Sequence, residues 1–293
     1  INSDLELNLI GKNHNKDKLL FNEISLKEKN KTISIKNLIL SNDNKIDDFD
    51  NIDIDYIDNY GLKNSLKFKK KSNDFLVSGK SFNIKSIIDE LLESENDKNL
   101  KIFNKNFKII FDIDSIYLDK DNSINNLNGF LLLKKNKISE LNLESKFSDN
   151  QKIKFTIKDN GTERVTTLYS HKAKPFVDRY KFIKGFEEGD LDFYSIKKND
   201  VTDSTLKIDN FKIQEIPVLA KLLTLASLQG IADLLTGEGI RFTDFEMKFL
   251  NKDKLMTITE LYAIGPAISI MLEGYIQSKK LISLRGTLVP ATT

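Results

Sequence analysis

Apolar and polar residues alternate along most of the chain, and this period of two limits the folds that it can adopt. Leu5, Leu7 and Leu9 alternate with polar residues in DLELNLI, and Leu206 and Ile208 do so in TLKIDN. Such strands bury one face and expose the other, as antiparallel sheets do. Polar turns such as SNDNKIDD and KDNG follow at intervals of roughly 8–12 residues, the spacing of a meander. We therefore predict a mainly β, mostly antiparallel structure of about fifteen strands.

A sheet of this size must fold over, form a sandwich or close, because a flat sheet cannot cover its apolar face. We expect an elongated sheet curled into a hydrophobic groove, with a few short helices. An ordinary closed core is the alternative for any single strand. Ten apolar residues on shared strand faces are candidates for the lipid-binding groove lining: Phe107, Ile109, Phe111, Ile113, Ile153, Phe155, Ile157, Ile268, Ile270 and Leu272.

Three segments depart from the alternation. SFNIKSIIDELLESEN (81–96) spaces its apolar residues along one face of a helix. KPFVDRYKFI has Pro175 where a first helical turn accepts proline. The third helix, predicted over 217–235, is apolar around nearly its whole circumference and is ended by glycines at 237 and 239. Its apolar residues include Leu222, Leu223, Leu225, Leu228, Ile231 and Leu234.

The helix at 217–235 is close to the minimum length of a membrane span. However, Lys221, Gln229, Gly230 and Asp233 interrupt it, and a charge near the middle of a bilayer is costly. We predict a helix buried on or inside the sheet. Closure of the groove end, contact with a membrane surface and a true span are the alternatives.

Glycine and proline mark joints in the last third of the chain. Gly265–Pro266 in AIGPAIS predicts a turn between two strands. Gly274 and Gly286 fall inside strand patterns, where glycine often marks a bulge or a close backbone approach. Such points help a sheet to curl.

Composition and motifs argue against several functions. Forty-five basic and 43 acidic side chains leave a net charge of +2, without the basic excess of a nucleic-acid-binding protein. The chain has no cysteine, and its two histidines, His14 and His171, are far apart in sequence. The Asp-rich stretch 42–58 lacks the EF-hand spacing, so calcium binding is a minor alternative. KFKKK (67–71) reads as a solvated turn, with contact to anionic headgroups as the alternative. We expect no enzyme activity, cofactor or metal.

The last third of the chain resembles the C-terminal part of the AsmA-like proteins of the Gram-negative envelope. Five pieces occur in the same order: IQEIPVLAKLL, ASLQGIADLLTGEGI, IRFTDFEMKF, AIGPAISIMLEGYI and LRGTLVP. Upstream, SGKSFNIKSIIDELLES is similar to the family's strand, glycine and short helix, whereas EEGD stands where a glycine pair is common. The family-like structural positions are Pro217, Gly230, Gly237, Gly239, Gly265, Pro266, Gly274, Gly286 and Pro290.

The resemblance implies a bridge-like periplasmic protein that conducts phospholipid between inner and outer membranes through a β-groove. It also implies an inner-membrane anchor outside this sequence, and other envelope proteins are candidate partners. We accordingly divide the chain into a β-rich groove segment (1–75), a second one with two short helices (76–210) and an AsmA-like C-terminal segment (211–293). The alternatives are an envelope scaffold that affects outer-membrane assembly and a protein that binds a single lipid.

Overall fold

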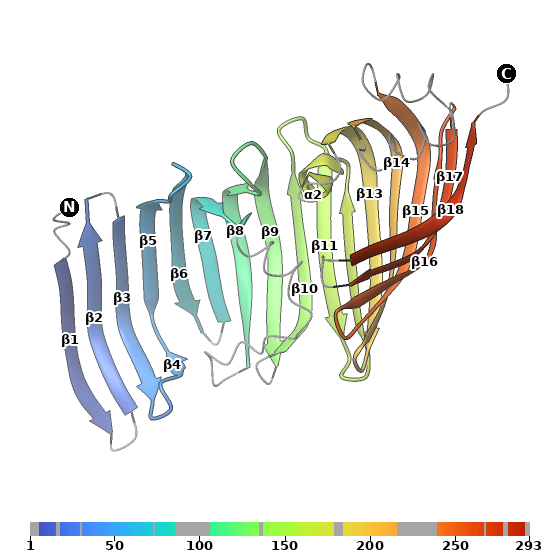
Figure 1. Ribbon diagram of the computed structural model, residues 1–293. Helices are drawn as coiled ribbons and strands as arrows, with labels where there is room; N and C mark the ends of the chain where they lie inside the picture. The colour runs from blue at the N-terminus through green and yellow to red at the C-terminus, as the bar shows by residue number, and fades with distance from the viewer. Residues whose placement is uncertain are drawn as a thin grey trace. The chain divides into compact units, whose positions relative to one another are not determined.

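The computed structural model describes residues 6–15, 18–29, 31–72, 74–85, 106–134, 137–178, 184–215, 239–266, 268–277 and 281–290. Within these ranges the chain forms 18 strands and the short helix α2 (Lys174–Val177) (Figure 1). The predicted fold class is confirmed: the protein is mainly β, with mostly antiparallel, curled sheet. The strands outnumber the expected fifteen or so. Two compact units divide the chain, Ile1–Asn150 with Thr156–Asp159 and Gln151–Phe155 with Asn160–Thr293.

The first unit is a meander in which each strand pairs with its neighbour in sequence. β3 pairs with both β4 and β5, and β7 and β8 form a parallel pair among otherwise antiparallel ladders. Its strands are β1 (Glu6–Asn15), β2 (Lys18–Glu28), β3 (Lys31–Ser41), β4 (Ile46–Asp48), β5 (Asn51–Ile57), β6 (Lys63–Lys71), β7 (Asp74–Asn83), β8 (Phe107–Tyr117), β9 (Ser123–Lys134) and β10 (Lys137–Lys146). β11 (Lys152–Asp159) contributes residues to both units.

One face of the first unit's sheet is apolar, and we call it the core face of that unit. Its buried cluster consists of Leu38, Phe49, Phe75, Phe107 and Leu133. The Phe49 and Phe75 rings stack with centroids 4.5 Å apart, and Phe75 meets Phe107 edge to face at 5.2 Å. Offset stacking and edge-to-face contact are the arrangements that phenyl rings prefer. The rings therefore join the segment between β4 and β5 to the paired strands β7 and β8.

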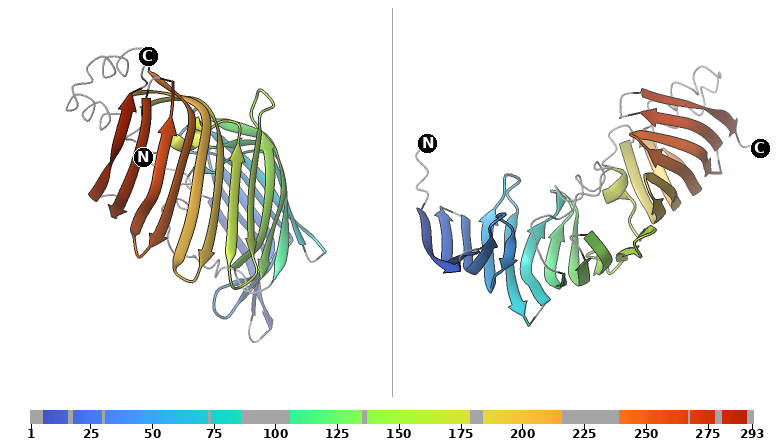
Figure 2. Two further views of the ribbon diagram at one scale, coloured as in Figure 1. Left: turned by 90° about the vertical axis from the view of Figure 1, so that its right-hand side faces the viewer. Right: turned by 90° about the horizontal axis from the view of Figure 1, so that it is seen from below.

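The second unit continues with longer strands. After β12 (Arg164–Ser170) and α2, consecutive strands pair in antiparallel fashion from β12 to β18. Figure 2 shows β13 to β18 side by side, with β18 at one edge. The remaining strands are β13 (Lys184–Lys198), β14 (Val201–Glu215), β15 (Ile240–Lys252), β16 (Leu255–Ile264), β17 (Ile268–Gln277) and β18 (Leu281–Pro290).

Two consecutive residues with positive φ lie within β13, next to α2. Glu188 and Gly189 both have positive φ, 63° and 86°, and Asn210 on the neighbouring strand has φ 53°. The backbone N–H of Ala173, at the start of α2, donates to the carbonyl of Gly189 at 2.8 Å. The register with β14 continues past this point without an extra residue on either strand, and β13 to β15 are visibly bent in Figure 1. The EEGD motif is therefore a bend inside a strand, where a joint between segments was expected.

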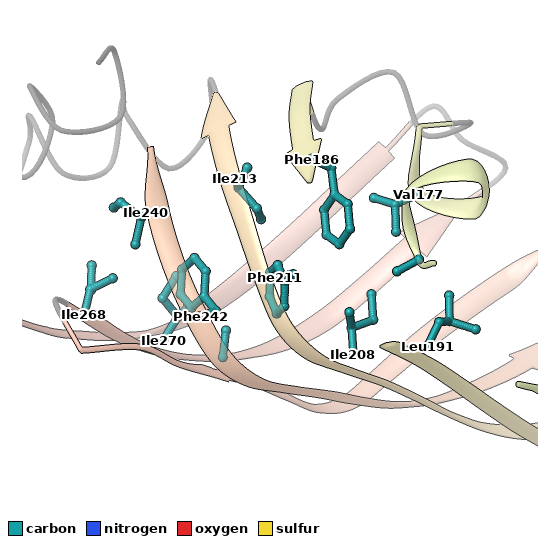
Figure 3. Close-up of a cluster of buried hydrophobic side chains, with 12 residues drawn as sticks. Val177, Phe186, Leu191, Ile208, Phe211, Ile213, Ile240, Phe242, Ile268 and Ile270 are labelled. Atoms are coloured by element: carbon teal, nitrogen blue, oxygen red, sulfur yellow. The ribbon is translucent and has the colours of Figure 1, made fainter. Parts of the chain in front are cut away.

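The core face of the second unit lies on the side covered by α2. Three phenyl rings stack across neighbouring strands: Phe186 and Phe211 at 5.2 Å, and Phe211 and Phe242 at 5.3 Å. The labelled side chains that belong to strands lie on one face of the sheet, and Val177 of α2 lies over the same face (Figure 3). The complete buried cluster is Ala173, Val177, Phe186, Leu191, Ile208, Phe211, Ile213, Ile240, Phe242, Ala263, Ile268 and Ile270.

The predicted helices agree with the structure only in part. Pro175 lies in the first turn of α2, as expected, but the described helix spans four residues. Residues 81–83, assigned to the start of a helix, belong to β7, and most of that helix falls outside the described residues. The apolar helix at 217–235, with Gly237, also lies outside them. The turn predicted at 67–71 is wrong, because these residues belong to β6.

Candidate functional site

Four predicted lining residues lie together on β8. Phe107, Ile109, Phe111 and Ile113 alternate along the strand, and Phe107 belongs to the buried cluster. Partner residues in neighbouring strands share a face of the sheet. The register places Ile109 between Phe75 of β7 and Leu131 of β9, and Phe111 beside Val77. The period-two pattern thus places these four side chains on the core face of the first unit.

The other six lining candidates lie on β11 and β17. Ile153 and Ile157 of β11 are buried, whereas Phe155 between them is only partly buried. Ile268 and Ile270 of β17 belong to the buried cluster of the second unit, and Leu272 packs against it.

Burial divides the ten candidates into two groups. A fully buried side chain can touch a lipid only if the group that covers it moves away. The four partly buried residues are therefore the better candidates for direct contact: Ile109, Phe111, Phe155 and Leu272. The six buried residues are Phe107, Ile113, Ile153, Ile157, Ile268 and Ile270.

The glycines of the last strands allow close backbone contact. A Cβ atom on Gly274 would lie 2.0 Å from the Ser283 carbonyl oxygen, and one on Gly286 would lie 1.9 Å from that of Met271. Gly274 also has φ +150°, which L residues rarely adopt. Gly265 follows β16, and its N–H donates to the Ile268 carbonyl at 2.9 Å, so the predicted turn at Gly265–Pro266 is confirmed.

Carboxylates form a row on the opposite, outer face of the second unit. Asp190 pairs in register with Asp209, and Asp209 pairs with Asp244 on the next strand. Burial raises the pKa of Asp209, and the charges of Asp244 and Asp190 raise it further. Sequence reasoning missed this row because the three residues belong to different strands, and only the register brings them together.

A second polar group on the outer face is built around Glu246, which is buried. The Tyr262 hydroxyl donates to its carboxylate at 2.8 Å, and the ammonium groups of Lys207 and Lys248 lie 3.1 and 3.3 Å away. These contacts, led by the Tyr262 hydrogen bond, lower the pKa of Glu246. The carboxylate is thus held ionised and links β14, β15 and β16.

His171 and two lysines of β6 each lie beside an aspartate side chain. His171 Nδ1 lies 2.9 Å from Asp190 Oδ1, with both side chains partly exposed to water. Lys67 and Lys63 lie beside Asp53 and Asp55 across the β5–β6 ladder. Over the described ranges, no group of three or more His, Cys, Asp or Glu side chains is placed to hold a metal ion. Among the same residues, no helix is long and apolar enough to cross a membrane.

Searches with the chain matched no family model, no curated protein and no solved structure. The resemblance to AsmA-like proteins consequently stays a prediction, carried by the order of the sequence pieces quoted above. Of those pieces, IRFTDFEMKF lies in β15, AIGPAISIMLEGYI extends from β16 through β17, and LRGTLVP lies in β18.

Proposed function

We propose that the protein carries phospholipid along the apolar core faces of its sheets, as part of a bridge between the inner and outer membranes. The observation that supports this most is the repetition of one apolar face from strand to strand within each unit. Such a face replaces the bilayer as the solvent for acyl chains. Each CH₂ group that it removes from water contributes about 0.8 kcal/mol of binding free energy. Periplasmic location and membrane anchoring are part of the same proposal and rest on the family resemblance.

Movement along such a face requires no individual catalytic residue. Dispersion and hydrophobic contacts are weak one by one and are shared among many side chains. A chain that slides by one strand exchanges one set of apolar contacts for another. Partly buried residues such as Phe111 and Leu272 would meet the lipid directly, while the buried ones support the wall.

A scaffold with a dry core is the second candidate function. It is favoured by the burial of six of the ten predicted lining residues. In that case the sheets would present edges and outer faces to other envelope proteins, and the clusters would serve stability alone.

Native mass spectrometry of the purified chain, with lipid extraction from the same sample, separates the candidates. Several phospholipids per chain support a conducting groove, about one supports a single-lipid carrier, and none supports the scaffold.

A photo-crosslinking amino acid then locates the lipid. We expect crosslinks to phospholipid from position 111, on the core face, and none from position 112, its outward-facing neighbour. Equal labelling at Phe111 and Asp112 would contradict the proposal, because the two side chains point to opposite faces of one strand.

A further inference from the structure

The turn between β11 and β12 contains one of the two Asn–Gly dipeptides of the chain, Asn160–Gly161. Three groups donate hydrogen bonds to the side-chain carbonyl oxygen of Asn160. They are the backbone N–H of Thr162 at 2.9 Å, the Thr162 hydroxyl at 2.8 Å and the backbone N–H of Glu163 at 2.9 Å. Asn160 and Gly161 are both exposed. The side-chain amide is therefore polarised by its own turn and accessible to water.

The three donors surround the oxygen on which negative charge develops when a nucleophile attacks the side-chain amide carbon. Oxyanion holes place their donors about 2.7–3.1 Å from that oxygen, and all three distances fall within this range. The nearest nucleophile in the chain is the backbone nitrogen of Gly161. Apart from its chain neighbours, no atom lies within 4 Å of the place that a Cβ on Gly161 would occupy. This backbone therefore has the space, and the conformational freedom of glycine, to turn toward Asn160 Cγ.

We propose that Asn160 is a site of spontaneous deamidation, promoted by the hydrogen bonds of the turn. The Gly161 nitrogen gives its proton to water and bonds to Asn160 Cγ. The bond between Cγ and Nδ2 breaks, and Nδ2 takes up a proton and leaves as ammonia. Water then opens the cyclic imide at either carbonyl, which leaves aspartate or isoaspartate at position 160. The reaction consumes only water, and the inference is independent of the proposed lipid transport.

The second Asn–Gly dipeptide, Asn128–Gly129, is an internal control. Asn128 is also exposed, but it lies within β9, and Gly129 pairs with Phe111 of β8 and with Leu143 of β10. A Cβ on Gly129 would lie 1.9 Å from the Asn142 carbonyl oxygen, so the backbone has no room to move. The ladders on both sides hold the Gly129 nitrogen in place. We therefore expect Asn128 to be protected in the folded chain.

Peptide mapping by mass spectrometry, after incubation of the purified chain at mildly alkaline pH, tests the proposal. In the folded chain we expect conversion at Asn160 and none at Asn128. In the chain unfolded with guanidinium chloride, both should convert at similar rates, because each is then an Asn–Gly dipeptide in a flexible backbone. An Asn160 that converts only in the unfolded chain would overturn the proposal. Equal conversion at the two positions in the folded chain would overturn it as well.

A substitution at Thr162 tests whether the hydrogen bonds promote the reaction. Thr162→Val removes the hydroxyl donor, keeps the shape of the side chain and should slow conversion at Asn160 roughly two- to tenfold, as the loss of one hydrogen bond predicts. Thr166→Val makes the same exchange further along β12 and should leave the rate unchanged. An unchanged rate in Thr162→Val, or equal slowing in both variants, would overturn the role given to the turn.

Discussion

Single residues in this protein are constrained mainly by what lies across from them in the neighbouring strand. Asp209 is the clearest case, because it has an aspartate as register partner on each side. Like charges directly opposite one another destabilise a sheet. Its raised pKa means that the folded protein holds this proton more tightly than the unfolded chain does. The contribution to stability is present at acidic pH and is lost as the pH rises through the folded-state pKa.

Asp209→Asn should therefore stabilise the protein at neutral pH, by about 0.2–1 kcal/mol. The difference in unfolding free energy between the variant and the wild type should shrink as the pH is lowered, since Asp209 is then protonated. Unfolding midpoints measured across the acid range check this. Asp200→Asn, in an exposed turn, serves as the control and should show no such trend. A gain for Asp209→Asn that is unchanged by pH would show that charge is not the cause.

At Gly274 we predict a loss of stability, in contrast to the gain expected for Asp209→Asn. Gly274→Ala should destabilise the protein by about 1–3 kcal/mol, because the new methyl group meets the Ser283 carbonyl oxygen and the positive φ is strained. Gly61→Ala separates the two causes, since Gly61 also has positive φ but no atom within 4 Å of the added Cβ. Urea unfolding should show the larger loss at Gly274. Equal losses would assign the whole effect to backbone strain.

At the scale of elements, aromatic stacking holds the long strands of the second unit together. Phe211 lies between Phe186 and Phe242 and also meets Phe245 edge to face at 6.2 Å. Phe211→Ala should cost about 3–5 kcal/mol in unfolding free energy, as expected for a buried phenylalanine. Tyr194→Ala, at an exposed position of β13, should change it by only about 0.5 kcal/mol or less. Denaturant unfolding of the two variants gives the comparison.

The strand faces could be predicted from sequence, because a period of two places alternate residues on one side without any knowledge of partners. This explains why Phe107 to Ile113 share a face as expected. The parallel pairing of β7 and β8 could not be predicted, since alternation is the same for either strand direction. The bend at Glu188–Gly189 depends on backbone φ and the aspartate row depends on register, and neither leaves a signal in local sequence.

At the scale of the whole molecule, the proposed transport is a property of continuous faces. Single alanine substitutions along a core face should barely change lipid transfer, because the remaining apolar contacts persist. Ile109→Asp and Phe155→Asp should block transfer, since a carboxylate is costly to leave without water or a partner. Transfer between vesicles loaded with labelled phospholipid measures both effects.

Ile110→Asp is the matched control for this experiment, because Ile110 lies on the outer face of β8 beside Ile109. We expect it to transfer lipid at close to the wild-type rate. If several folded core-face variants still transfer lipid, the proposed transport along the core face is wrong. Equal loss in the outer-face variant would point to a general defect of the sheet.

The pairing of each strand with its neighbour in sequence also has a consequence in time. Within each unit, most ladders join segments separated by one short turn, so little chain entropy is lost before a contact forms. A strand can add to the sheet as soon as it emerges from a ribosome or a membrane channel, without waiting for the rest of the chain. The ladders of β7 with β8 and of β14 with β15 are the exceptions, because 23 and 24 residues separate these strands in sequence and must be available before each ladder can close. During synthesis or export, strand addition should therefore wait longest at β8 and β15.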